Sequence, residues 1–591
     1  MCGITGIISN QRIDKQALEQ SVSVLKHRGP DGNGVFVSTN GCVGFGHSRL
    51  AFLDVSAEAN QPLSTSNGHL TITFNGEIYN FLELRVELQS AGYKFVTHSD
   101  TEVLLTAYEC WGTEMLSKLK GMFAFAIYDS INKHVFLARD RFGIKPLYYG
   151  VFGTSFVFGS EIKALFPFSD VKKKIRRQSV ATFLANRYVP SPHTIWEGIF
   201  QLPAATSLYL NCETFEQEIS QYWKLDIRND LGNIQQTEKE VKNLILNSIS
   251  QHLRSDVQVG SFLSGGMDSS LLVVGMKELN YDPIEAFSLG FDGWSDSEHF
   301  HARDVSVALG ITLHEKLEGV SSLDIVDNLM YFYDNPIADI SIVPTFSISK
   351  LASLHVKAVL SGEGADECLA GYWWQKPERF LFKNKFQQYK AKLFGTSFEQ
   401  IKGHYIQAAS MGMFDSSELE NAFTEEWKTA IPSDPFGHLD KFYKRGISTL
   451  KQIQFLDLNL FMTELVLAKI DRATMANSLE ARVPFLDHEL VEKLFSLDEK
   501  LYFDEKIQKK MIRSFLEKKV PSTVYNRNKQ GFVGPNSFYE NEATYREKLV
   551  DGRLVNDGVI KSSYIDKLLQ TNDYWRLWKL YVLECWWRVW C

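Results

Sequence analysis

The sequence predicts an α/β multidomain protein with two regions of different character and a largely helical C-terminal portion. Three observations support this fold class. The chain has 591 residues, more than one hydrophobic core usually serves, so at least two domains are expected. Apolar residues make up 44% and charged residues 23%, as in folded proteins. Short strand-like runs dominate the beginning of the chain, whereas strands, glycine loops and helices alternate after residue 237.

The first region combines predicted strands with predicted helices. Apolar runs bounded by Gly and Asn predict strands, and helical patterns lie between them, which indicates layers of sheet and helix. The predicted strands are 3–8, 69–74, 123–128 and 135–138, and the predicted helices are 14–25 and 79–90. The polar stretch 227–237 has the composition of a linker, so we expect one domain over 1–212 and a second over 237–591.

The second region repeats the order strand, glycine loop and helix. An apolar run at 257–263 leads into a glycine turn and a helical pattern at 268–279. Such alternation predicts a doubly wound parallel sheet whose ligands bind beyond the carboxyl ends of its strands. Further strands are expected at 284–291, 311–315 and 356–360, with a helix at 303–309.

Mainly helical patterns follow from about residue 380 to the end of the chain. The last helix is expected at 574–591, where apolar residues recur at heptad spacing. These residues are Trp575, Trp578, Val582, Cys585 and Val589. The stripe predicts a helix packed into the core, and an aromatic surface for a membrane or a ligand is the alternative.

Composition and charge argue against several classes of function. The net charge is −8, so electrostatics does not favour general binding to nucleic-acid phosphates. No apolar run approaches the ~20 residues that span a bilayer, and the first residues lack the regions of a secretory signal. Seven scattered cysteines form no CxxC pair, which argues against a disulfide framework or a cysteine zinc site. We expect a cytoplasmic protein without a nucleic-acid or membrane partner; a homodimer is left open.

Cys2 is the first candidate for chemistry. Removal of Met1 would leave a free α-amine on the residue that carries the thiol. The amine pKa of about 8 lies close to the thiol pKa of about 8.5, so the amine can accept the thiol proton directly or through a water. One residue would then supply both the nucleophile and the base.

Four short motifs follow Cys2 in the first region. They are HRGPDG at 27–32, GHSRL at 46–50, NGEIYN at 75–80 and the pair Ser99–Asp100. Together with Cys2 they resemble a class II glutamine amidotransferase domain, with the motifs in family order. The resemblance implies the N-terminal-nucleophile (Ntn) hydrolase fold, an αββα sandwich.

Each motif residue suits one part of glutamine or of its hydrolysis. Arg49 offers a bidentate fork for the α-carboxylate, and Glu77 with Asp100 can accept from the α-ammonium. The tetrahedral oxyanion needs preorganised donors, which the Asn75 amide and the Gly76 backbone N–H can supply. The resemblance implies catalysis by Cys2, Asn75 and Gly76, and glutamine binding by Arg49, Leu50, Asn75, Gly76, Glu77 and Asp100.

The glycine turn that follows the apolar run 257–263 has the composition of a phosphate-binding loop. Small residues let backbone N–H groups approach a phosphate, and the next helix adds its positive N-terminus. The chain has no GxxxxGK[ST] sequence, so a P-loop kinase or GTPase is excluded. SGGMDSS at 264–270 resembles instead the PP-loop of ATP pyrophosphatases, with an adenine nucleotide alpha-hydrolase-like fold, which cleave ATP between its α and β phosphates.

A second loop, SGEGADE at 361–367, follows the strand expected at 356–360 and should lie at the same end of the sheet. Several carboxylates within five residues need cations or a protonation task. SGGMDSS, SGEGADE and LEARVPFLD at 479–487 are similar to the synthetase half of glutamine-dependent asparagine synthetases. With the first region, the resemblance covers nearly the whole chain and is weak in 376–449 and in the tail.

The resemblance also assigns residues of the second site. Glu363 matches the carboxylate associated with the adenylate and with ammonia attack, and Lys529 matches a catalytic lysine that stabilises phosphate charge. Asp268 and Asp366 match ligands of Mg²⁺, which prefers oxygen. ATP binding falls on Leu263, Ser264, Gly265, Gly266, Asp268, Ser269, Ser270, Leu289, Ser361 and Gly362. Asp471–Arg472 and 480–487 resemble a wall between the sites, or are buried structural ion pairs.

The expected function is an ATP-dependent amidation. Cys2 would release ammonia from glutamine, ATP with Mg²⁺ would adenylate a carboxylate, and ammonia would displace AMP. L-aspartate is the first acceptor by resemblance. The chain departs from the usual family form at Cys368–Leu369–Ala370 and Trp373–Trp374, so a uronic sugar or a secondary-metabolite acid stays an alternative acceptor. A catalytically silent regulator that binds glutamine or nucleotide is the alternative of a different class.

Overall fold

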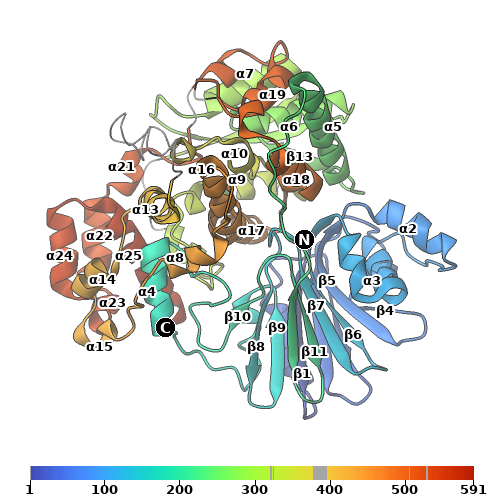
Figure 1. The fold of residues 1–591 in the computed structure, drawn as a ribbon. Coiled ribbons are helices and arrows are strands. Elements are labelled where there is room, and N and C mark those ends of the chain that lie inside the picture. Colours follow the sequence, from blue (N-terminus) through green and yellow to red (C-terminus); the bar gives the residue numbers. More distant parts are fainter. Residues whose placement is uncertain (1, 320–322, 324, 377–395, 505, 528–529) are drawn as a thin grey trace.

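The structure of the protein is a computed structural model. It describes residues 2–319, 323, 325–376, 396–504, 506–527 and 530–591 (Figure 1). The N-terminal half is built on antiparallel sheets, and the C-terminal half is built on a parallel sheet followed by helices. Among the described residues, no helix has both the length and the apolar content that crossing a membrane requires.

Two six-stranded antiparallel sheets form the N-terminal half, in the orders β10-β8-β9-β1-β3-β2 and β12-β11-β7-β6-β5-β4. Alternate residues of both sheets, such as Ile4 and Phe158 on one and Ala126 and Leu208 on the other, share one core between them. The strands are β1 (Gly3–Ser9), β2 (Gly32–Val37), β3 (Val43–Arg49), β4 (Leu63–Ser64), β5 (Leu70–Ile78), β6 (Gly121–Asp129), β7 (His134–Arg139), β8 (Tyr148–Phe152), β9 (Ser155–Gly159), β10 (Phe200–Gln201), β11 (Thr206–Asn211) and β12 (Gln217–Gln221).

Helices cover the outer faces of the two sheets. Helix α1 (Lys15–Ser23) packs on β3, and α2 (Phe81–Ser90) with α3 (Asp100–Trp111) packs on the second sheet at β5. The side chain of Asp14 caps α1 by accepting from the Gln16 N–H at 2.8 Å. The predicted αββα sandwich is therefore confirmed.

Five parallel strands form the sheet of the C-terminal half, in the order β15-β14-β13-β16-β17. The order reverses between β13 and β16, which places a ligand crevice beyond the carboxyl ends of these two strands. The strands are β13 (Val259–Phe262), β14 (Glu285–Phe291), β15 (Thr312–Glu318), β16 (Ala358–Leu360) and β17 (Glu480–Arg482). The helices near the sheet are α5 (Ile234–His252), α6 (Met267–Glu278), α7 (His299–Leu309), α9 (Ile342–Ala352), α18 (His488–Ser496) and α19 (Lys510–Leu516). The predicted doubly wound parallel sheet is confirmed.

The start of α5 differs from the expectation for 227–237. The Asn233 side chain accepts from the N–H groups of Gln235 and Gln236 at 3.0 and 3.1 Å, so it caps a helix that begins at Ile234. The last residues of the predicted linker are therefore helical, because a polar composition does not distinguish a linker from the exposed first turn of a helix.

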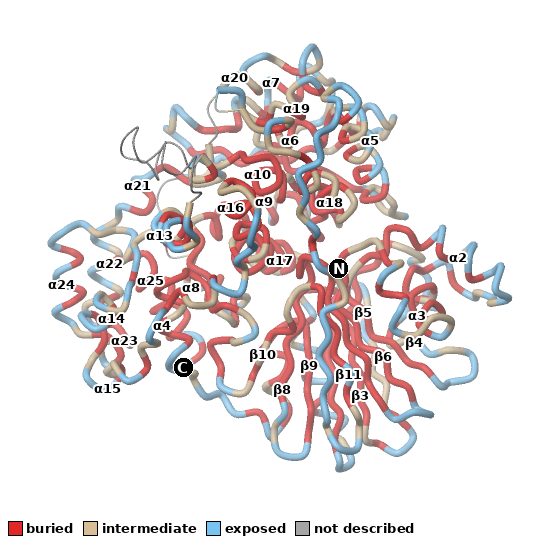
Figure 2. Tube along the Cα trace, viewed as in Figure 1, coloured by how far each residue is buried: buried red, intermediate tan, exposed pale blue. Residues whose placement is uncertain are grey.

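The remaining helices build the largely helical C-terminal portion. They include the π-helix η6 (Asp457–Val466), and buried residues run through most of them (Figure 2). The α-helices are α8 (Ile325–Leu329), α10 (Ala365–Leu369), α13 (Phe398–Ala409), α14 (Ser416–Ala422), α15 (Glu425–Lys428), α16 (Thr449–Leu456), α17 (Leu467–Met475), α20 (Thr523–Asn526), α21 (Asn536–Tyr539), α22 (Glu542–Leu549), α23 (Arg553–Asn556), α24 (Ser562–Gln570) and α25 (Tyr574–Trp590).

One helix of the N-terminal half lies apart from the two sheets of that half. Helix α4 (Arg177–Asn186) lies among the orange and red C-terminal helices in Figure 1. Its Phe183 and Leu184 share a core with Trp578 of α25. The ammonium group of Lys579 donates to the carbonyl oxygen of Leu184 at 2.7 Å. The end of α4 is thereby fixed against the C-terminal half.

Candidate active sites

Cys2 lies immediately before β1 and is buried. Its nitrogen lies 3.0 Å from Asn75 Oδ1, and its thiol donates to the carbonyl oxygen of Leu50 at 3.9 Å. Burial raises the pKa of the Cys2 thiol, so a base is needed to take its proton. The structure therefore brings together three of the predicted residues, Cys2, Leu50 and Asn75.

Asn75 and Gly76 stand on β5 next to the nucleophile. The Asn75 Nδ2 is buried and has no hydrogen-bond partner among the described residues, so this donor is available to a ligand. A Cβ at Gly76 would lie 2.1 Å from the carbonyl oxygen of Met122, so only glycine fits there. This placement suits the predicted pair of oxyanion donors.

The predicted glutamine-binding residues are buried near the same strand. Asp100 accepts from the Ile78 N–H at 2.9 Å, and burial raises its pKa to about 6. Burial also raises the pKa of Glu77 well above its ordinary value. The Arg49 guanidinium donates to Ser56 O and Asn60 Oδ1, both at 2.8 Å, so it holds the loop that follows β3. Arg49 must exchange or share these partners to bind a carboxylate.

The second site lies where the loops after β13 and β16 meet. A Cβ at Gly362 would lie 3.2 Å from Asp268 Cβ, which shows how closely the two loops approach. Both loops line one cavity of about 840 Å³. The predicted residues that line it are Leu263, Ser264, Gly266, Asp268, Ser269, Ser361, Gly362, Glu363 and Asp366. The Ser361 hydroxyl donates to Glu363 Oε2, which fixes this carboxylate at the cavity wall.

Three predicted ATP residues are not among those that line the cavity. A Cβ at Gly265 would lie 2.4 Å from the backbone carbon of His301, so this glycine lets α7 pack on the loop. Ser270 is fully buried in α6, and Leu289 is buried in β14. Their contact with ATP stays a prediction.

Asp268 and Asp366 share one cation in the structure, Lys509. Its ammonium group pairs with Asp268 Oδ1 and lies 2.5 Å from Asp366 Oδ1. Positive charge is thus stable between the two carboxylates, and Mg²⁺ is usually held by one or two carboxylates together with substrate phosphates. The two residues therefore fit the predicted metal site in the presence of ATP.

The predicted Lys529 lies outside the described residues. On either side of it, Arg527 and Gln530 line the cavity, and Arg527 Nη2 donates to Glu298 Oε1 at 3.0 Å. Lys509 is a site residue that sequence reasoning missed. Its only local signal is a lysine before a short amphipathic segment, and this signal is too common to identify a site.

Buried ion pairs connect the two sites. Arg28 Nε donates to the carbonyl oxygen of Cys2 at 3.0 Å, and its two terminal nitrogens donate to Asp471 at 2.9 and 3.0 Å. Arg482 on β17 lies 2.6 Å from Glu480 and 3.6 Å from Glu77 of the first site. Two of the predicted wall residues therefore reach the first site: Asp471 pairs with Arg28, which contacts Cys2, and Arg482 lies near Glu77.

Two protein families match this chain, one in each half. A glutamine amidotransferase domain matches residues 1–223, and asparagine synthase matches residues 240–588. Fold, site and match together define a glutamine-dependent amidotransferase with an ATP-using synthetase half. The chain belongs to the asparagine synthase family.

Curated relatives agree with this membership. Asparagine synthetase [glutamine-hydrolyzing] 1 of Bacillus subtilis is 32% identical over 99% of this chain and 96% of that protein. A putative asparagine synthetase of Methanocaldococcus jannaschii is 34% identical over 63% of this chain and 76% of that protein. Amidase chry2 of Gibberella zeae is 26% identical over 91% of this chain and 90% of that protein.

Proposed function

We propose that this chain forms L-asparagine from L-aspartate, with glutamine as the nitrogen donor and ATP as the activating substrate. The proposal divides the chain into a glutaminase domain, 1–212, and a synthetase domain, 237–591. The observation that carries it is the presence of two chemically different centres in one chain: a buried thiol beside a free amide donor, and two loops with four carboxylates around one cavity.

The first centre supports thiol chemistry on an amide. Without Met1, the Cys2 amine would take the thiol proton, and the thiolate would attack the side-chain carbonyl carbon of glutamine. Asn75 Nδ2 and the Gly76 N–H would stabilise the oxyanion. Ammonia leaves as the thioester forms, and water then releases glutamate and restores the thiol.

The second centre supports adenylation of a carboxylate. The acceptor oxygen attacks the α-phosphorus of ATP and pyrophosphate leaves; ammonia then attacks the acyl carbon and AMP leaves. Lys509 and the N-terminus of α6 stabilise phosphate charge, and Glu363 accepts the proton that ammonia loses. Mg²⁺, held by Asp268 and Asp366, would neutralise phosphate charge when it is bound.

A second acceptor class has an observation in its favour. Trp373 and Trp374 line the cavity, whose volume of about 840 Å³ leaves room for a larger carboxylate beside ATP. The amidases of Gibberella zeae and Penicillium rubens, 26% and 28% identical to this chain, bear names other than asparagine synthetase. A larger carboxylic acid is therefore the second candidate.

The test is pyrophosphate release with ATP, Mg²⁺, ammonia and one carboxylate at a time. We expect release with L-aspartate, and we expect Cys2→Ala to lose glutamine-dependent amide formation while it keeps the ammonia-dependent reaction. Release with a uronic or larger acid and none with aspartate would refute the asparagine assignment. Loss of both reactions in folded Cys2→Ala protein would refute two separate centres.

A further inference from the structure

Arg187 comes from the part of the chain that matches the amidotransferase domain, yet it lines the cavity of the synthetase half. It ends α4 with a left-handed φ of +72°, where glycine is the usual residue. Its N–H donates to Phe183 O at 2.7 Å, and its carbonyl oxygen accepts from the Ala338 N–H at 2.8 Å. The backbone therefore holds this side chain in one place despite its unfavourable conformation.

The Arg187 guanidinium is buried and incompletely paired. Its Nε has no hydrogen-bond partner among the described residues. Its nearest carboxylate oxygen, Asp339 Oδ2, lies 3.8 Å from Nη1, and Nη1 lies 2.9 Å from the Met411 sulfur, a weak acceptor. Arg28, by contrast, is bound at both terminal nitrogens by Asp471. A buried guanidinium with so little compensation favours an anionic ligand.

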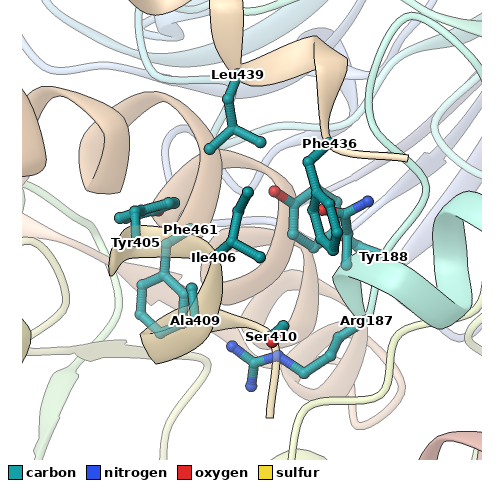
Figure 3. A pocket seen from close by; sticks show the side chains of 10 residues that line it. Arg187, Tyr188, Tyr405, Ile406, Ala409, Ser410, Phe436, Leu439 and Phe461 are labelled. Carbon is teal, nitrogen blue, oxygen red and sulfur yellow. The ribbon is translucent and has the colours of Figure 1, made fainter. Parts of the chain in front are cut away.

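The side chains next to Arg187 line one part of the cavity, called the arm here, and they come from segments other than the two loops. The Phe461 ring of the π-helix η6 lies 5.7 Å from the guanidinium carbon of Arg187. In Figure 3 the Arg187 side chain extends beneath Ser410 toward Ala409 and Phe461. The small cavity in this view, about 20 Å³, holds no more than one water, so a ligand must approach from the large cavity.

A second cation, Lys469, lines the same arm and donates to Ser341 Oγ at 2.9 Å. Ser341 in turn donates its N–H to Asp339 Oδ1 at 2.8 Å. The arm therefore presents two cations and one carboxylate to the cavity. This charge pattern is complementary to a molecule that carries a carboxylate and an ammonium group.

We propose that Arg187, assisted by Lys469, binds a second anionic group of the acceptor, the one that is not adenylated. Asp339 is placed to accept from an ammonium group on the same molecule. The proposal rests on the proposed function and narrows its substrate class: the acceptor carries two anionic groups, as L-aspartate does. On this proposal, a residue from the part of the chain that matches the amidotransferase domain binds the acceptor in the synthetase half.

The experiment compares matched acceptors and matched variants in the ammonia-dependent reaction. L-aspartate is compared with β-alanine, which lacks only the α-carboxylate, and succinate is compared with butanoate. Arg187→Met keeps the length of the side chain without its charge, and Arg187→Lys keeps a charge without the fork. Arg177→Met is the control, because Arg177 lies on the same helix and pairs with Glu426 at the surface.

In the wild-type protein we expect each diacid to be preferred over its monoacid. Arg187→Met should lower kcat/KM for the diacids about 10- to 100-fold, chiefly by raising the KM for the diacid. The KM for ATP should be unchanged, and so should the rate of glutamine hydrolysis. The preference should then disappear, Arg187→Lys should lie between, and Arg177→Met should match the wild type.

Three results would overturn the inference. One is an unchanged diacid preference in Arg187→Met, and another is an equal loss of kcat for all acceptors, which is the signature of a structural role. The third is a wild-type preference for monoacids. If aspartate alone fails while succinate or another diacid reacts, the asparagine assignment is refuted and the role of Arg187 is supported.

Discussion

The two polar atoms of the Asn75 amide have different surroundings. Its Oδ1 lies 3.0 Å from the Cys2 nitrogen, and its buried Nδ2 is left without a partner in the described structure. We propose that Nδ2 stabilises the oxyanion, so we expect Asn75→Ala to lower glutaminase kcat about 10²- to 10³-fold. The ammonia-dependent reaction is the internal control and should be unchanged. A variant with normal glutaminase kcat would remove Asn75 from the oxyanion site.

Asp100 predicts a pH dependence of glutamine use. Burial raises its pKa to about 6, so it is protonated below this pH and ionised above it. In its proposed role Asp100 attracts the α-ammonium of glutamine only when it is ionised, so kcat/KM for glutamine hydrolysis should rise between about pH 5 and 7. In Asp100→Asn this limb should be absent and KM high throughout. A wild-type profile that is flat across this range would contradict the role.

At the scale of elements, α25 illustrates both the use and the limit of periodicity. Trp578, Val582 and Cys585 of the predicted stripe are buried, as a packed helix requires. Trp575 and Val589 are 38% and 41% exposed, whereas every residue from Leu577 to Trp587 is buried. Neighbouring helices surround the middle of α25, so its burial depends on position along the helix as well as on its face.

Two tryptophans of α25 should therefore differ in their effect on stability. Trp578 is buried and donates from Nε1 to Ala338 O at 3.1 Å, so Trp578→Ala should cost about 3–5 kcal/mol through the cavity it leaves. Trp575→Ala, on the exposed end of the helix, is the matched control and should cost less than 1 kcal/mol. Urea unfolding followed by circular dichroism measures both. Equal losses would show that the burial pattern does not decide stability here.

The positions of the two loops could be predicted because each loop belongs to a single strand–loop–helix unit. SGGMDSS and SGEGADE each follow a strand of the parallel sheet, and β13 and β16 are neighbours in it. Parallel neighbours end at the same edge, so their loops meet. That edge could be predicted from the sequence, whereas the Lys509 side chain, which reaches it from the residue before α19, could not, because no local pattern places a distant helix.

At the scale of the whole molecule, Arg28 joins the two halves. It donates to Cys2 O, to Glu161 and to Asp471, and it is fully buried. Removal of one member of a buried ionic group leaves its partners uncompensated. The boundary between the sites therefore depends on this guanidinium, and ammonia transfer should depend on the same boundary.

Arg28→Met should destabilise the folded protein by about 3–5 kcal/mol and uncouple the two reactions. We expect more glutamate per amide formed than in the wild type, with the ammonia-dependent rate retained. Lys133→Met is the control, because the Lys133–Glu213 pair is exposed and screened by solvent, so its loss should leave both stability and the glutamate-to-amide ratio close to the wild type. An unchanged ratio of glutamate to amide would show that the ion pairs do not seal the boundary.

The sequence by itself determined the layers of both halves, the loops SGGMDSS and SGEGADE at one edge of the parallel sheet, and the residue types around Cys2. Each of these follows from interactions within one segment: strand periodicity, glycine turns and the intrinsic chemistry of a thiol, an amide or a carboxylate. Only the tertiary structure decided that Arg28 pairs with Asp471, 443 positions away, and that Arg187 of the first half lines the cavity of the second. It also decided that the pKa of Asp100 rises to about 6. Charge partners and burial depend on how separate elements pack, and the local pattern of a chain carries no measure of that packing.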